Sequence, residues 1–197
     1  GRYPNVPTLY GEFEQRLWTL IFSSEQLAKQ NGVGYLYFSD ADWFHPTVRF
    51  TQRFQQNNLR FIRSERCLVY PAVVSQPTQF AFSSPSALPT FLELFPNGKI
   101  TEIVNRPDSY VDAALLNVPV GTTTAEADQP GLASFDQAFT LLALEAMAET
   151  HAGETLTMTL RWRAEAMIEG AYTVFVHLIS EANPYWAGSD GEPCLGD

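Results

Sequence analysis

The sequence predicts an α/β domain with a small mixed sheet, followed by an antiparallel β-sandwich of the jelly-roll type. Helix-like and strand-like runs alternate over the first 120 residues, whereas alternating strand patterns dominate the rest. The chain is 45% hydrophobic and 13% aromatic but only 17% charged, which is typical of a packed, strand-rich protein. We expect the α/β domain at residues 1–120, a linker at 121–131 and the sandwich at 132–197.

The first domain is expected to begin with an amphipathic helix over residues 11–30. Asn31-Gly32 follows at the position of a left-handed C-cap. The apolar side chains that recur at helical spacing are Phe13, Leu17, Leu20, Ile21 and Leu27 or Ala28.

Residues 33–39 form a nearly continuous apolar run, which predicts a strand that is covered on both faces. A polar loop at 40–42 comes next. Pro46 is well placed to begin a helix that reaches about Gln56. The residues expected on the buried stripe of that helix, at intervals of three and four, are Val48, Phe50, Thr51 and Phe54.

The remaining elements of this domain are expected as strands at 59–62, 67–70 and 78–82, a helix at 87–95, and strands at 100–104 and 110–118. The stretch 119–131 has two Pro, two Gly and no large apolar residue except Val120, which indicates the linker. The strands expected beyond it are 137–150, 154–163, 171–180 and 185–188.

Two strongly alternating runs within residues 155–180 surround one short polar connection and predict a β-hairpin. The first arm is apolar on one face, through Leu156, Met158, Leu160 and Trp162. The second arm, around 172–179, is apolar on both faces and is therefore expected to be central in its sheet.

The charge of the chain disfavours nucleic acid as a partner. Its formal net charge is -10, and its twelve Lys and Arg form no cluster that would neutralise phosphates. No apolar segment reaches the roughly 20 residues that span a bilayer. Because the chain starts at Gly1 without Met and stops shortly after a strand pattern, we interpret it as part of a longer protein.

The sequence contains two cysteines, Cys67 and Cys194, which fall in different predicted domains. Neither has a CxxC partner or a neighbouring His, so a metal pair is disfavoured. A disulfide between them stays open as an alternative, but their separation favours two unpaired thiols.

The last 55 residues resemble a module at the C-terminal end of bacterial multi-spanning glycosyltransferases that use polyprenyl-phosphate sugars and are related to protein mannosyltransferases. The matching segments are Ala152-Gly153-Glu154, Leu160 to Ala164, Tyr172 to Leu178, and Asp190-Gly191-Glu192-Pro193. This resemblance also decides between helix and strand for 139–148, which is rich in helix-forming residues and is assigned as a strand. The upstream YLYFS, HPT and CLVYPA runs resemble the stem that precedes the module.

The resemblance implies a non-catalytic extracytoplasmic domain of a membrane glycosyltransferase, without a cofactor in this stretch. It implies contact with a glycan, or with a polyprenyl-phosphate sugar acceptor complex through the parent protein. The family's catalytic acid lies in a loop near its first membrane helices, so no residue here inherits it. The family pattern continues past Asp-Gly-x-Pro, so the sandwich of this chain is expected to be truncated.

Candidate ligand-binding residues follow the apolar run 33–39, namely Ser39, Asp40, Asp42 and His45. Ligands of open α/β sheets collect beyond the carboxyl ends of strands, and this set suits a sugar or a cation. The competing structural interpretation is that Asp42 or His45 caps the helix that begins at Pro46.

Other candidates lie near the C-terminus. Tyr185 and Trp186, in a loop, suit a stacking platform for a glycan. Asp190, Glu192 and Asp197 carry oxygens of the kind that bind calcium, but Asp190-Gly191 more simply indicates a tight turn. His177 is interpreted as a packed histidine rather than a metal ligand.

Two other function classes remain open. One is a free-standing carbohydrate-active or sugar-binding protein with its site at 39–45. The other is a structural or partner-docking stem without a ligand. The sequence carries no Gly-x-Ser-x-Gly, HExxH or phosphate-loop motif.

Overall fold

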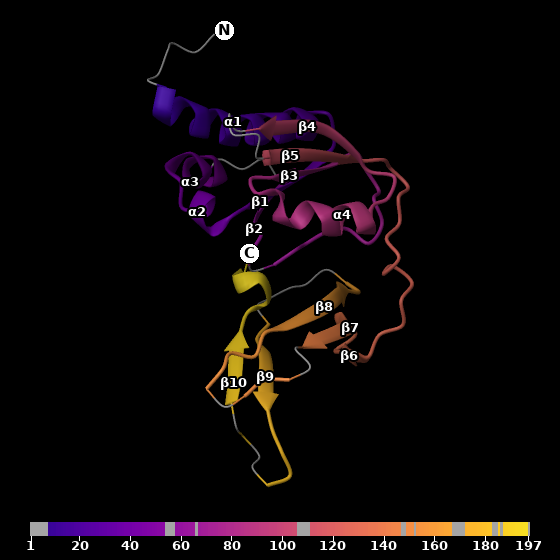
Figure 1. Ribbon diagram of the computed structural model, residues 1–197. Helices are drawn as coiled ribbons and strands as arrows, with labels where there is room; N and C mark the ends of the chain where they lie inside the picture. Colours follow the sequence, from indigo (N-terminus) through magenta and orange to yellow (C-terminus); the bar gives the residue numbers. More distant parts are fainter. Residues whose placement is uncertain are drawn as a thin grey trace. The chain divides into compact units, whose positions relative to one another are not determined.

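A five-stranded mixed sheet organises the N-terminal part of the chain (Figure 1). The structure is a computed structural model that describes residues 8–53, 58–65, 67–105, 111–146, 149–151, 153–166, 172–182, 185 and 187–196. By internal contacts the chain divides into two compact units, one formed by Gly1–Thr123 with Tyr172–Asp197 and the other by Thr124–Ala171. The predicted fold class, an α/β domain followed by antiparallel β-sheet, is confirmed.

The strands of the mixed sheet follow the order β2-β1-β3-β5-β4. Strand β1 lies parallel to both β2 and β3, whereas β5 lies antiparallel to β3 and β4. The strands are β1 (Val33–Phe38), β2 (Leu59–Arg63), β3 (Thr78–Phe82), β4 (Lys99–Asn105) and β5 (Val111–Val118).

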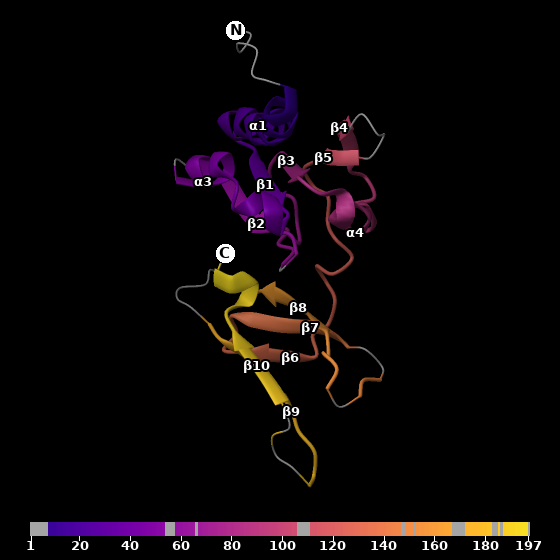
Figure 2. The same ribbon diagram turned by 60° about the vertical axis from the view of Figure 1, so that its left-hand side comes forward.

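The helices of this unit lie on both faces of the sheet, with α1 and α4 on opposite sides (Figure 1 and Figure 2). They are α1 (Thr8–Lys29), α2 (Asp40–Trp43), α3 (Pro46–Arg53), the 3-10 turn η1 (Pro85–Ala87) and α4 (Leu88–Leu94). A further 3-10 turn, η2 (Pro193–Gly196), follows the last strand of the chain and does not cover this sheet. None of the helices within the described residues is both long enough and apolar enough to cross a membrane.

Alternation along the strands creates one core on each face of the sheet. From β1, Leu36 and Phe38 enter the core under α1 and α3, and Tyr37 enters the core under α4. Burial of each such large side chain contributes about 1.5–3 kcal/mol. The α4 core is aromatic and contains Tyr37, Phe80, Phe82, Phe91 and Phe95.

Helix α1 ends as the sequence predicts. Asn31 adopts a left-handed conformation with φ 61°, and the Gly32 amide donates to the Leu27 carbonyl at 3.0 Å. The Asn31 amide donates to the Ala28 carbonyl at 3.2 Å. These two hydrogen bonds form a Schellman cap, which satisfies carbonyls that the helix end leaves without partners.

Three local predictions for this unit are wrong. Residues 40–42 form one turn of helix rather than a loop, because Ser39 caps it. Residues 67–70 form no strand of the sheet, although Leu68 and Tyr70 pack against the α4 core. Phe50, placed on the buried stripe of α3, is 63% exposed.

The unit Thr124–Ala171 contains a three-stranded antiparallel sheet in the order β6-β7-β8. Its strands are β6 (Ala133–Phe135), β7 (Phe139–Ala146) and β8 (Met158–Ala164). The strand prediction for residues 139–148 is therefore confirmed over the described part, against the helix propensity of Leu, Ala and Glu.

The hairpin predicted for residues 155–180 is wrong. Strand β8 pairs with β7, and β9 (Val174–Leu178) pairs with β10 (Ala187–Gly191) in a separate two-stranded ribbon (Figure 2). The apolar residues of β9 are consequently not central in a sheet, and Phe175 is 66% exposed.

Cys67 and Cys194 form a disulfide, with their Cα atoms 5.0 Å apart. The expectation of two unpaired thiols is therefore wrong. The bond joins the segment after β2 to the turn after the β9–β10 ribbon, across 127 residues of sequence.

Candidate functional site

Three serines mark the carboxyl ends of the three parallel strands. Ser39, Ser64 and Ser83 directly follow β1, β2 and β3. After β1 the chain turns to α2 and α3, which pack on the α1 face, whereas after β3 it turns to α4 on the other face. Adjacent strands whose connections leave to opposite faces create a topological switch point, the usual ligand position in open α/β sheets.

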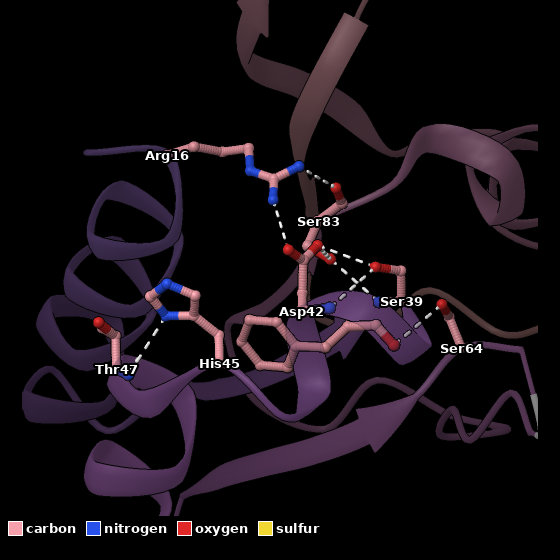
Figure 3. Close-up of polar contacts among 8 residues, drawn as sticks. Arg16, Ser39, Asp42, His45, Thr47, Ser64 and Ser83 are labelled. Carbon is pink, nitrogen blue, oxygen red and sulfur yellow. Dashed lines mark hydrogen bonds and ion pairs between the residues drawn. The ribbon is translucent and has the colours of Figure 1, made fainter. Parts of the chain in front are cut away.

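Asp42 occupies this switch point and is almost fully buried, at 2% exposure (Figure 3). The Ser39 hydroxyl accepts a hydrogen bond from the Asp42 amide at 3.3 Å, which begins the short helix α2. That turn directs the Asp42 carboxylate toward Ser83, whose hydroxyl donates to Oδ2 at 2.6 Å. The Ser39 hydroxyl lies 3.0 Å from the same oxygen.

Arg16, from α1, provides the positive charge that balances Asp42. One guanidinium nitrogen lies 2.5 Å from Asp42 Oδ1, and another donates to the Ser83 carbonyl oxygen at 2.9 Å. Both charged side chains are nearly inaccessible to solvent. A buried charge is tolerated when it is paired and hydrogen-bonded in this way, so the pair fastens α1 to the ends of β1 and β3.

A second ion pair lies nearer to solvent. Arg63, the last residue of β2, donates from Nε and from a terminal nitrogen to Asp40 Oδ1 at 3.0 and 2.8 Å. Its guanidinium carbon also lies 5.3 Å from the Phe44 ring centroid. The Asp40 side chain retains 35% exposure, so this carboxylate is the more accessible of the two.

His45 has a structural contact at the start of α3. Its Nδ1 accepts a hydrogen bond from the Thr47 amide at 3.3 Å (Figure 3). This geometry matches the capping interpretation for His45, whereas Asp42 contributes to the buried ion pair instead.

The predicted site residues thus separate into two groups. Ser39, Asp40, Asp42 and His45 lie together at the strand ends. Tyr185 lies in the connection between β9 and β10, where its ring contacts that of His177. Trp186 lies outside the described residues, as does Asp197 of the calcium alternative.

Sequence reasoning missed three partners of the strand-end group: Arg16, Arg63 and Ser83. A signal existed for Arg16, because an arginine next to Leu17 of the buried stripe needs an acidic partner when it is covered. Ser83 and Arg63 are recognisable only once β3 and β2 are known to flank β1.

Within the described ranges, no group of three or more His, Cys, Asp or Glu side chains is arranged to hold a metal ion. Searches against protein-family models, curated proteins and solved structures give no match for this chain. The arrangement at the strand ends can orient loops and pair charges, and Asp40 can accept hydrogen bonds from a polar ligand.

Proposed function

We propose that this chain is a non-catalytic extracytoplasmic domain of a bacterial membrane glycosyltransferase that uses a lipid-linked sugar donor. In this role it contacts glycan or the acceptor complex while the membrane-embedded part of the parent protein performs the transfer. The resemblance of the last 55 residues motivates the proposal.

The Cys67–Cys194 disulfide is the observation that carries it. Structural disulfides persist in oxidising compartments such as the periplasm and cell surface, and they are rare in the reducing cytosol. The Cys67–Cys194 bond links segments 127 residues apart, and a structural bond of this kind fits an extracytoplasmic location.

The chemistry at the strand ends supports a non-catalytic role. The Asp42 carboxylate is neutralised by Arg16 and receives a hydroxyl hydrogen bond from Ser83. The Asp40 carboxylate receives two hydrogen bonds from Arg63. Both carboxylates thus already have partners from the protein itself, which suits a structural role.

A second candidate is a free-standing carbohydrate-active or sugar-binding protein with its site at residues 39–45. The position of these residues at a topological switch point favours it. Under this alternative, Asp40→Asn and Asp42→Asn in the isolated chain abolish activity or binding. Under our proposal, Asp40→Asn changes neither.

The test determines on which side of the membrane the domain lies. Spheroplasts that express the parent protein are treated with added protease and blotted with an antibody against this chain. We expect cleavage without lysis, together with thiol labelling of Cys67 and Cys194 only after reduction. Protection until lysis, with thiols that label without reductant, would contradict the proposal.

A cytosolic marker protein that stays intact controls for leakage. A Cys67→Ala/Cys194→Ala variant controls for labelling at other sites, since the chain contains only these two cysteines.

A further inference from the structure

One face of the β9–β10 ribbon carries a row of exposed rings. Phe175 and His177 lie two residues apart in β9 and therefore point to the same face. In the antiparallel register Phe175 is opposite Asp190 and His177 is opposite Gly188, so these β10 residues share that face.

The rings contact one another edge to face. The His177 ring lies 5.2 Å from the Tyr185 ring at an interplanar angle of 84°. It also lies 6.3 Å from the Phe175 ring at 71°. Phe175 and Tyr185 are 66% and 55% exposed, so an aromatic row remains open to solvent.

Gly188 makes room for this row. A Cβ atom at residue 188 would lie 2.7 Å from His177 Cδ2 and 2.9 Å from the Tyr185 hydroxyl oxygen. Any larger residue therefore forces the His177 and Tyr185 rings to shift. The absence of a side chain at this position lets the two rings lie across β10.

Asp190 supplies the polar counterpart. Its Oδ1 lies 3.3 Å from His177 Nε2, and its side chain is 52% exposed. The pair orients the imidazole and leaves the carboxylate accessible to hydroxyl donors from solvent or ligand.

We propose that this face, formed by Phe175, His177, Tyr185 and Asp190, is a binding platform for a neutral glycan. The inference deepens the proposed function, on which it rests for the presence of glycan near the domain. A pyranose ring has an apolar C–H face, which stacks on aromatic rings, and hydroxyl groups at its rim, which donate to a carboxylate.

The charges of the chain favour a neutral sugar over the other occupants. The formal net charge of -10 and the Asp190 carboxylate disfavour an anionic glycan. A second copy of the chain would bring two such charges together and would bury Asp190 and His177 against the same groups, which costs desolvation energy.

The test begins with an array of neutral hexasaccharides of glucose, mannose and galactose in α and β linkages. The strongest probe is then titrated into the ¹⁵N-labelled oxidised chain. We expect amide shifts confined to residues 174–178 and 185–191. No binding probe, or shifts located elsewhere, would overturn the inference.

Variants assign the binding to the rings. Tyr185→Ala, Phe175→Ala and Gly188→Ala are expected to weaken binding of that probe about tenfold or more, equivalent to about 1.4 kcal/mol. Tyr185→Phe keeps the ring and should stay within about threefold of the unchanged chain. The matched control is Phe50→Ala, an aromatic 63% exposed on α3, which should not change affinity.

An equal loss in Phe50→Ala, or concentration-dependent self-association that Tyr185→Ala abolishes, contradicts the glycan platform. Amide spectra of each variant report whether the ribbon still folds. If an alanine variant no longer folds the ribbon, Tyr185→Phe still tests whether the aromatic ring without its hydroxyl is sufficient for binding. Failure here is distinguishable from failure of the proposed function, since the protease and thiol experiments report location without glycan.

Discussion

At the scale of single residues, Asp42 is the point where three segments meet. Its carboxylate contacts Arg16 of α1, Ser39 at the end of β1 and Ser83 at the end of β3. Because Asp42 is only 2% exposed, water cannot replace a hydrogen-bond or charge partner that a mutation removes from its carboxylate.

Removing one partner of the pair should therefore destabilise the unit strongly. We expect Arg16→Met to lower the free energy of unfolding by about 3–5 kcal/mol, because it leaves a buried carboxylate without its counter-charge. Urea denaturation followed by far-UV circular dichroism measures this change.

The control for this prediction is Asp40→Asn at the more exposed pair, which should cost at most about 1 kcal/mol. The double variant Arg16→Met/Asp42→Leu should recover part of the loss, because neither charge then remains buried. Equal losses in Arg16→Met and Asp40→Asn would show that the buried pair contributes no more than an exposed one.

The sequence alone could locate two of the four residues around the Asp42 carboxylate. Ser39 and Asp42 are recognisable because they follow a run that predicts a buried strand of an open α/β sheet. The pairing of Asp42 with Arg16 and Ser83 could not be assigned, since these residues lie 26 and 41 positions away from Asp42, and only the tertiary fold brings such positions together.

At the scale of elements, local signals predicted element type better than strand pairing. The α1 cap at Asn31 is a local signal, because φ and the cap hydrogen bonds depend on a few adjacent residues. Pairing of β8 with β7 rather than with β9 depends on distant segments, and alternation within 155–180 carries no information about it.

The Asn31 cap permits a prediction on helix α1. Asn31→Ala should lower the free energy of unfolding by about 1 kcal/mol, since alanine in the left-handed region is strained. Asn31→Gly should be neutral or slightly stabilising, because glycine adopts φ 61° without a steric cost. Thermal and urea denaturation of both variants measure the difference.

The matched control is Gln30→Ala, directly before the left-handed residue. A loss for Gln30→Ala as large as that for Asn31→Ala would attribute the effect to helix propensity rather than to the left-handed cap.

At the scale of the whole molecule, the disulfide is the feature that sequence patterning could not supply. Cys67 and Cys194 are separated by 127 residues, and the unit Thr124–Ala171 lies between them in sequence. Spacing rules for cysteines apply to short frameworks and metal sites, whereas this bond depends on where two distant segments meet.

Reduction of this bond should release the ribbon before the five-stranded sheet. A two-stranded ribbon is only marginally stable by itself, and a disulfide over so long a loop contributes about 2–5 kcal/mol by restricting the unfolded chain. We therefore expect amide hydrogen exchange in β9 and β10 to accelerate at least about tenfold after reduction, whereas β1 and β3 keep their protection. The Cys67→Ala/Cys194→Ala variant should reproduce the reduced pattern without added reductant, which separates loss of the bond from effects of the reagent. Unchanged exchange in the ribbon would mean that its own contacts hold it, and equal acceleration in β1 would mean that the bond supports the whole unit rather than its C-terminal part.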